Sequence, residues 1–137
     1  MKFEDRYFKK FNFTKEQIIK NIDNAIRDLD IAKTDTILDV KFNYAYTAMI
    51  KAGIALLSFH RQKVKSAPGH HIKIIEKLAQ ILKDESIADF GNLIRSKRNL
   101  DLYDGGIEVT KKECLEYIDF VESVISRVRN IILKQEQ

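Results

Sequence analysis

Charged and amide side chains gather in the stretch RSKRNLDLYDGG, residues 95–106. Arg95, Arg98 and Asn99 lie three and four positions apart, so on a helix they share one face. Asp101 follows Arg98 by three residues, close enough to orient its guanidinium group. A planar guanidinium, an amide and a phenol together suit a phosphate-bearing ligand. The stretch therefore predicts a ligand site, with a salt-bridged helix end as the alternative; its candidate residues are Arg95, Arg98, Asn99, Asp101, Tyr103 and Asp104.

A second candidate is the segment HRQKVKSAPGHHIK, residues 60–73, which holds all three histidines and four cations but no carboxylate. It leads into an expected helix, whose free N-terminal amides favour negative charge. Two interpretations follow: an anion-binding loop, to which His70 and His71 contribute, or a solvated charged loop, which is the commoner structure for such a run of charges.

Metal binding and nucleophilic catalysis have weaker support. The rings of adjacent His70 and His71 point to different sides of a helix, and no His-x-x-x-His or Cys-x-x-Cys spacing occurs. We therefore expect neither a metal nor another cofactor. Cys114 lies in the first turn of the last expected helix, where the dipole can lower a thiol pKa. A lone helical cysteine is far more often a packing residue, and we interpret Cys114 in that way.

Composition sets outer limits on the class of protein. A chain of 137 residues fits one domain, residues 1–137, and can bury a core without disulfides. A net charge of +4 permits an anionic partner without requiring one. No apolar run is long enough for a membrane span, and MKFEDRYFKKF does not resemble a signal peptide. With a single cysteine, these features predict a cytoplasmic protein that does not enter a membrane.

Helical periodicity runs through most of the chain. Thr14 with Gln17, and Thr110 with Glu113, form capping-box patterns that predict helix starts. A second helix is expected from about residue 39 to residue 60, with a stripe of small residues for close packing. A third follows Pro68-Gly69, and a fourth begins near Ser86 and ends at Gly105-Gly106. The stripe of small residues consists of Ala45, Ala48, Ala52 and Ala55.

The predicted fold is all-α, an antiparallel up-and-down bundle of four main helices plus a short extra helix. Ser86 with Asp89 is expected to cap the fourth helix. The aromatic lead-in, residues 3–13, is expected to form a short docked helix, and no strand is expected. The last helix has two apolar faces, which predicts a central position or a shared subunit interface.

Two stretches resemble the HEPN family (higher eukaryotes and prokaryotes nucleotide-binding domain). YAYTAMIKAGIALLSFHRQKVKSAPGHHIKIIEKL, residues 44–78, is similar to the family's Tyr- and Ala-rich helix, basic loop and following helix. IRSKRNLDLYDGG, residues 94–106, looks like its Arg-Asn motif. The resemblance covers about residues 40–130. It implies an antiparallel helical bundle, commonly homodimeric and often paired with a small nucleotidyltransferase in toxin–antitoxin-type modules.

Many HEPN proteins are metal-independent ribonucleases that use an arginine followed, after four to six residues, by a histidine. By position these places fall on Arg98 and Tyr103, and no histidine follows His71. The pKa of an unperturbed tyrosine is ~10, so Tyr103 would need strong activation to transfer protons near neutral pH. Otherwise His70 or His71 would have to take over proton transfer from the neighbouring helix. The tyrosine that accepts nucleotidyl groups in some relatives falls here on Gly105.

The resemblance therefore favours a HEPN-type nucleotide- or RNA-binding module over an enzyme, and leaves open whether catalysis survives without the motif histidine. It would be homodimeric, with a small nucleotidyltransferase as its partner, and would bind through Arg98, Asn99 and Tyr103. One alternative is a metal-independent ribonuclease toxin with an atypical active site, in which Arg98 and Tyr103 are the catalytic candidates. Another is a non-catalytic helical interaction protein.

Overall fold

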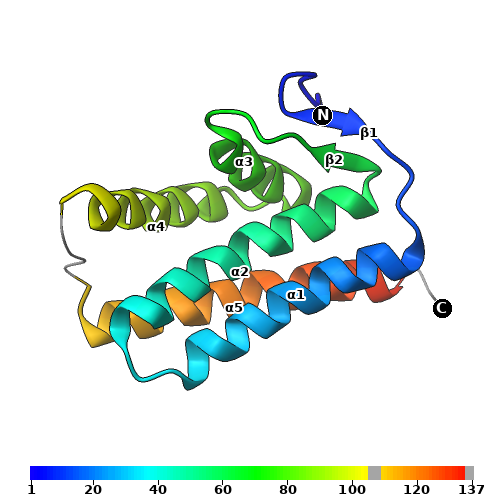
Figure 1. Cartoon of the computed structure of the whole chain (residues 1–137). Coiled ribbons are helices and arrows are strands. Elements are labelled where there is room, and N and C mark those ends of the chain that lie inside the picture. The colour runs from blue at the N-terminus through cyan, green and yellow to red at the C-terminus, as the bar shows by residue number, and fades with distance from the viewer. Residues whose placement is uncertain (105–108, 135–137) are drawn as a thin grey trace.

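A computed structural model describes residues 1–104 and 109–134, with the backbone alone for residues 100–104. The described residues form five helices and one two-stranded sheet (Figure 1). This confirms the all-α class. None of the described helices combines the length and hydrophobicity needed to cross a membrane. The elements are β1 Phe8–Lys10, α1 Lys15–Thr34, α2 Leu38–Phe59, β2 Gln62–Val64, α3 His70–Leu82, α4 Glu85–Asp104 and α5 Lys111–Lys134.

Helix α2 is the centre of the bundle and packs against α1, α3, α4 and α5. In Figure 1, α1 and α2 run antiparallel with α5 alongside them, while α3 and α4 cover another side of α2. The predicted stripe of small residues is fully buried: Ala45, Ala48, Ala52 and Ala55 are each 0% exposed. Its small side chains allow the neighbouring helices to approach α2 closely.

Helix α3 approaches α2 closely at Gly53. A Cβ atom at this position would lie 2.3 Å from Cγ2 of Ile74, which is itself fully buried. Only glycine fits this contact without displacing α3. Since α3 begins at His70, the Gly53–Ile74 contact helps to fix where His70 and His71 lie.

Two of the predicted helix starts are confirmed, and one is corrected. Thr14 and Gln17 form both hydrogen bonds of a capping box before α1. Thr110 and Glu113 do the same before α5. The expected Ser86–Asp89 cap of α4 is wrong, because α4 begins at Glu85 and Asp84 accepts hydrogen bonds from the Ser86 backbone and hydroxyl. The predicted helix stop at Gly105-Gly106 lies outside the described residues.

The prediction of a short helix in the aromatic lead-in is also wrong. The expectation that the chain contains no strand is wrong as well. Residues 8–10 form β1, which pairs antiparallel with β2. Each strand has three residues, too few for a period-two pattern to appear in the sequence. The register places Phe8 opposite Val64, with Phe8 buried, and Lys9 opposite Lys63, with both lysines exposed.

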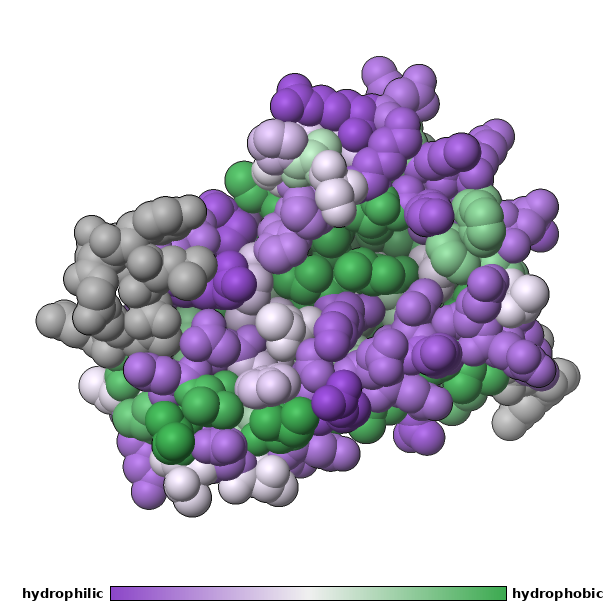
Figure 2. Space-filling view, in the orientation of Figure 1, coloured by the Kyte–Doolittle hydropathy of each residue, from purple (hydrophilic) through white to green (hydrophobic). Residues whose placement is uncertain are grey.

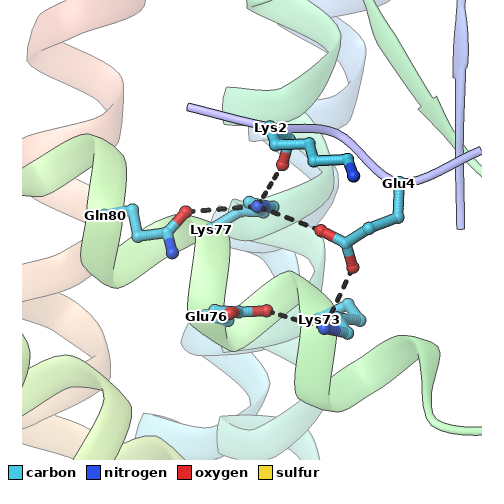
Figure 3. A network of polar contacts seen from close by, with 6 residues as sticks. All are labelled: Lys2, Glu4, Lys73, Glu76, Lys77 and Gln80. Carbon is cyan, nitrogen blue, oxygen red and sulfur yellow. Dashed lines mark hydrogen bonds and ion pairs between the residues drawn. The ribbon is translucent and has the colours of Figure 1, made fainter.

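A buried lysine fastens the N-terminal segment to α3 (Figure 3). Lys77 is 2% exposed, and its ammonium group contacts the Lys2 carbonyl, the Glu4 carboxylate and the Gln80 amide oxygen. Glu4 also pairs with Lys73 at 2.9 Å, one turn closer to the start of α3. A buried ammonium group requires such partners, because an unpaired charge in the interior is strongly unfavourable.

Candidate functional site

A hollow of about 540 Å³ lies where the start of α3 faces α2 and α4. One wall is the loop before α3 together with the first turn of that helix. The opposite wall comes from α4, which contributes Arg95 and Asn99 one helical turn apart. Tyr46 of α2 also borders the hollow. The lining residues are Tyr46, Ser66, Ala67, Pro68, Gly69, His70, His71, Ile72, Arg95 and Asn99.

The start of α3 turns its positive end toward this hollow. Gly69 occupies the N-cap in the left-handed conformation, with φ at 83°, and no side chain caps the helix. The first turn carries no acidic residue. His70 is held at the entrance, since its Nδ1 donates to the Ala67 carbonyl oxygen at 2.8 Å. Uncapped amides at a helix N-terminus form a favourable environment for an anion.

Tyr46 and His71 form a polar pair at the base of the α3 wall. The Tyr46 hydroxyl lies 2.7 Å from His71 Nδ1, and Tyr46 is 1% exposed. Burial, together with the smaller effects of the positive charges of His70, Arg98 and Arg95, lowers the pKa of His71 to about 4. Burial also raises the pKa of Tyr46, against the opposing effect of Arg98 and Arg95. At neutral pH the pair therefore consists of a neutral imidazole and a neutral phenol.

Arg98 packs on the aromatic face of Tyr46. Its guanidinium carbon lies 4.9 Å from the Tyr46 ring centroid, the geometry of a cation–π contact. Its Nε is buried without a hydrogen-bond partner. Arg95, by contrast, reaches the lining, with Nε 3.4 Å from Asn92 Oδ1. Of the two predicted arginines, Arg95 borders the hollow, while Arg98 supports the Tyr46–His71 pair.

The structure brings part of the predicted site together. Arg95 and Asn99 from the α4 motif meet His70 and His71 from the basic segment in the same hollow. The side chains of Asp101, Tyr103 and Asp104 lie outside the described residues, so their proposed contribution stays a prediction. Three lysines of the basic segment instead contact other parts of the chain. Lys63 lies over the Phe11 ring, and Lys65 donates to the Asp5 carbonyl oxygen. Lys73 pairs with Glu4 and Glu76.

The role of Tyr46 is the main feature that the sequence analysis missed. In the sequence it lies beside the stripe of small residues and fits a packing role. A tyrosine on a buried helix face still needs a partner for its hydroxyl group. That requirement was a usable signal, but the sequence does not show that the partner is His71, 25 residues away.

Cys114 is a packing residue in the core, as expected. It is 0% exposed, and burial raises the pKa of its thiol despite the nearby charge of Lys41. Within the described parts of the chain, no three His, Cys, Asp or Glu side chains are grouped in a way that could hold a metal ion.

A second, smaller hollow of about 330 Å³ lies between α1 and α2. Its central residue is Asp28, which is 2% exposed and accepts from Lys51 Nζ at 2.7 Å and Thr47 Oγ1 at 3.1 Å. The Asp28 carboxylate is already paired with Lys51 and Thr47 of α2, so its simplest role is to join α1 to α2.

Comparisons with protein-family models, curated proteins and solved structures found no match to this chain. The resemblance to the HEPN family therefore rests on the two sequence stretches that carry it.

Proposed function

We propose that this protein is a HEPN-type binding module whose hollow takes a nucleotide or the phosphate-bearing end of an RNA. The observation that carries the proposal is the meeting of Arg95 and Asn99 with the uncapped start of α3 in one hollow. Guanidinium, amide and helix amides are donors suited to phosphate oxygens, and Tyr46, His70 and His71 add rings around them.

The resemblance supplies the rest of the proposal. Through the resemblance, the Arg-Asn motif and the Tyr- and Ala-rich helix imply a homodimeric module paired with a small nucleotidyltransferase; we further propose a cytoplasmic location. Copurification of the chain with a coexpressed nucleotidyltransferase encoded beside it tests the partner. Sedimentation of the purified protein tests the dimer.

Nucleotide binding is tested by calorimetric titration with the four nucleoside 5′-monophosphates. Arg95→Gln and Asn99→Ala should each weaken binding about tenfold or more, because each removes a donor from the lining. Arg129→Gln, an exposed change on α5, is the matched control for lost charge. Equal affinities of wild type and Arg95→Gln would overturn the proposal. Arg98→Ala is a less specific test, since it also removes packing from Tyr46.

A metal-independent ribonuclease is the second candidate, favoured by the position of His71. The α4 motif lacks a histidine, yet the neutral His71 imidazole lines the same hollow as Arg95. In this alternative Nε2 of His71 takes the proton of a ribose 2′-hydroxyl and later releases it to solvent, while Nδ1 stays bonded to the Tyr46 hydroxyl. The 2′-oxygen attacks the adjacent phosphorus, and the bond to the 5′-oxygen breaks. The departing 5′-oxygen takes a proton from solvent. Cleavage of RNA in the presence of EDTA, lost in His71→Gln, supports this activity; cleavage retained in that variant excludes the role of His71.

A further inference from the structure

The outer face of the β1–β2 ribbon carries an unfavourable pairing of charges. Lys9 and Lys63 are direct cross-strand partners, and both side chains are exposed. Like charges directly opposite each other destabilise a strand pair. No carboxylate of the described residues forms an ion pair with either lysine. The ribbon therefore holds positive charge that the described part of the chain does not neutralise.

Two more cations flank the ribbon; Lys10 points to the face opposite that of Lys9, because successive side chains of a strand alternate, so it adds charge at the end of β1 and not on the outer face. Lys10 ends β1, and Arg61 precedes β2; both are exposed and have no ion pair among the described side chains. Arg61 also holds a positive φ of 62°, which is uncommon for a residue with a side chain. Its carbonyl accepts from the Phe11 amide at 3.1 Å, so the two segments stay joined beyond the strands. In Figure 2 hydrophilic residues cover the upper right of the molecule, where β1 and β2 lie in Figure 1.

An exposed aromatic ring lies among these cations. Phe11 is 39% exposed, and its ring packs against Phe13 with centroids 4.6 Å apart. Lys63 Nζ lies 5.3 Å from the same ring. Aromatic rings beside cations are the elements with which proteins bind single-stranded nucleic acids, because bases stack on the ring while the cations bind phosphates.

The ribbon is continuous with the hollow. Strand β2 ends at Val64, and the wall of the hollow begins two residues later at Ser66. The Tyr7 hydroxyl, next to β1, lies 3.7 Å from where a Cβ of Gly69 would be. The strand that carries Lys63 therefore leads directly into the wall of the hollow.

We propose that the β1–β2 ribbon binds the backbone of a single-stranded nucleic acid, with Phe11 as a stacking surface for one of its bases. The inference deepens the proposed function and rests on it in one respect: the bound nucleic acid runs from the hollow to the ribbon. The bound ligand is then an oligonucleotide rather than a lone nucleotide. Cations with an exposed ring also suit an anionic membrane, but continuity with a polar hollow favours the nucleic acid.

The test measures fluorescence anisotropy of a labelled single-stranded 12-mer of RNA, the same DNA sequence and its duplex, over 50–200 mM salt. The variant is Lys9→Gln/Lys63→Gln, and its control is Lys20→Gln/Arg129→Gln, two exposed cations on α1 and α5. Each lost phosphate contact reduces the slope of log K against log salt by about 0.7. We expect the ribbon variant to bind either single strand about tenfold more weakly than the control, with a slope smaller by about 1.4. Phe11→Ser should weaken binding with no change of slope.

The outcomes separate this inference from the proposed function. Equal affinity and slope in the ribbon and control variants overturn the ribbon site, as does a duplex bound as tightly as the single strands. Loss of binding to phosphatidylserine vesicles with unchanged binding to the 12-mers assigns the face to a membrane and overturns the inference. Arg95→Gln reports on the hollow through nucleoside monophosphates, which do not reach the ribbon. A ribbon effect without an Arg95 effect keeps the inference and rejects the nucleotide site.

Discussion

The Tyr46 hydroxyl lies 2.7 Å from Nδ1 of His71, joining α2 to the first turn of α3 at the edge of the hollow. Arg98 of α4 packs on the aromatic ring of the same Tyr46. Three helices therefore meet through three polar side chains. Burial of His71, with a smaller effect of the positive charges around it, lowers its pKa and keeps the imidazole neutral well below neutral pH.

This environment predicts a loss of stability in mild acid. The pKa of His71 is about 4 in the folded protein against 6.5 for an unperturbed histidine. Between these values the unfolded chain binds a proton that the folded protein does not, so the free energy of unfolding falls as pH falls from 6.5 to 4. The shift corresponds to at most about 3 kcal/mol, less where solvent reaches the ring. Urea unfolding at pH 4, 5, 6 and 7 measures it.

His71→Gln is the comparison that isolates this residue, because His60 also has a pKa lowered by burial. The difference in unfolding free energy between wild type and His71→Gln should decrease as pH falls. If this difference stays constant from pH 7 to 4, the loss of stability in acid does not come from the low pKa of His71. NMR titration of the His71 ring adds a direct reading, and Tyr46→Phe should raise its pKa if the phenol donates to Nδ1.

The sequence was sufficient for the helices and for part of the site. Capping boxes at Thr14 and Thr110 are local hydrogen-bond patterns, so their spacing alone located two helix starts. Arg95 and Asn99 could be assigned to one helix face for the same reason. The partnership of Tyr46 with His71 joins residues on different helices, and helical periodicity carries no information about which faces meet.

The ribbon and the N-terminal segment show the same limit. β1 and β2 are short and lie more than 50 residues apart, so pairing rather than local pattern defines them. Lys77 fits an exposed position by residue type, yet its ammonium group is buried by residues from the start of the chain. Long-range partners of this kind become visible only in the folded structure.

The buried Lys77 predicts an asymmetry between two substitutions. Among the described side chains, Glu4 provides the one carboxylate that contacts the Lys77 ammonium group, so Glu4→Gln leaves this group with the Lys2 carbonyl and Gln80. We expect a lower Tm than in Glu116→Gln, an exposed control with the same charge change. Lys77→Met should be milder, because replacing a buried charge with an apolar side chain of similar length is often nearly neutral.

A double variant completes this cycle. Lys77→Met introduced into Glu4→Gln should recover part of the lost Tm, since no buried charge then lacks a partner. Additive losses in the double variant would show that Glu4 stabilises the fold through Lys73 alone.

Cys114 should be protected from thiol reagents in the folded protein. Its side chain is fully buried, and burial raises the pKa of the thiol, so both access and thiolate formation are reduced. Reaction with Ellman's reagent at pH 8 should be at least about a thousandfold slower than for a free thiol, reflecting the small fraction of unfolded chains. Ser126→Cys in a Cys114→Ala background places an exposed thiol on the same helix and should react at the free rate.

The contact of Gly53 with Ile74 predicts the sign of a glycine-to-alanine change. In an open helix, alanine stabilises relative to glycine by about 1 kcal/mol. Here the added Cβ would lie 2.3 Å from Ile74 Cγ2, and Ile74 is fully buried and cannot move into solvent. Overpacking of this kind costs about 1–3 kcal/mol, so we expect Gly53→Ala to lower the free energy of unfolding in urea titrations. Combining it with Ile74→Ala should make the two losses less than additive, because the second change removes the clashing methyl group. A Gly53→Ala variant more stable than wild type would mean that α3 is not held this close to α2, and the wall formed by His70 and His71 would have to lie elsewhere.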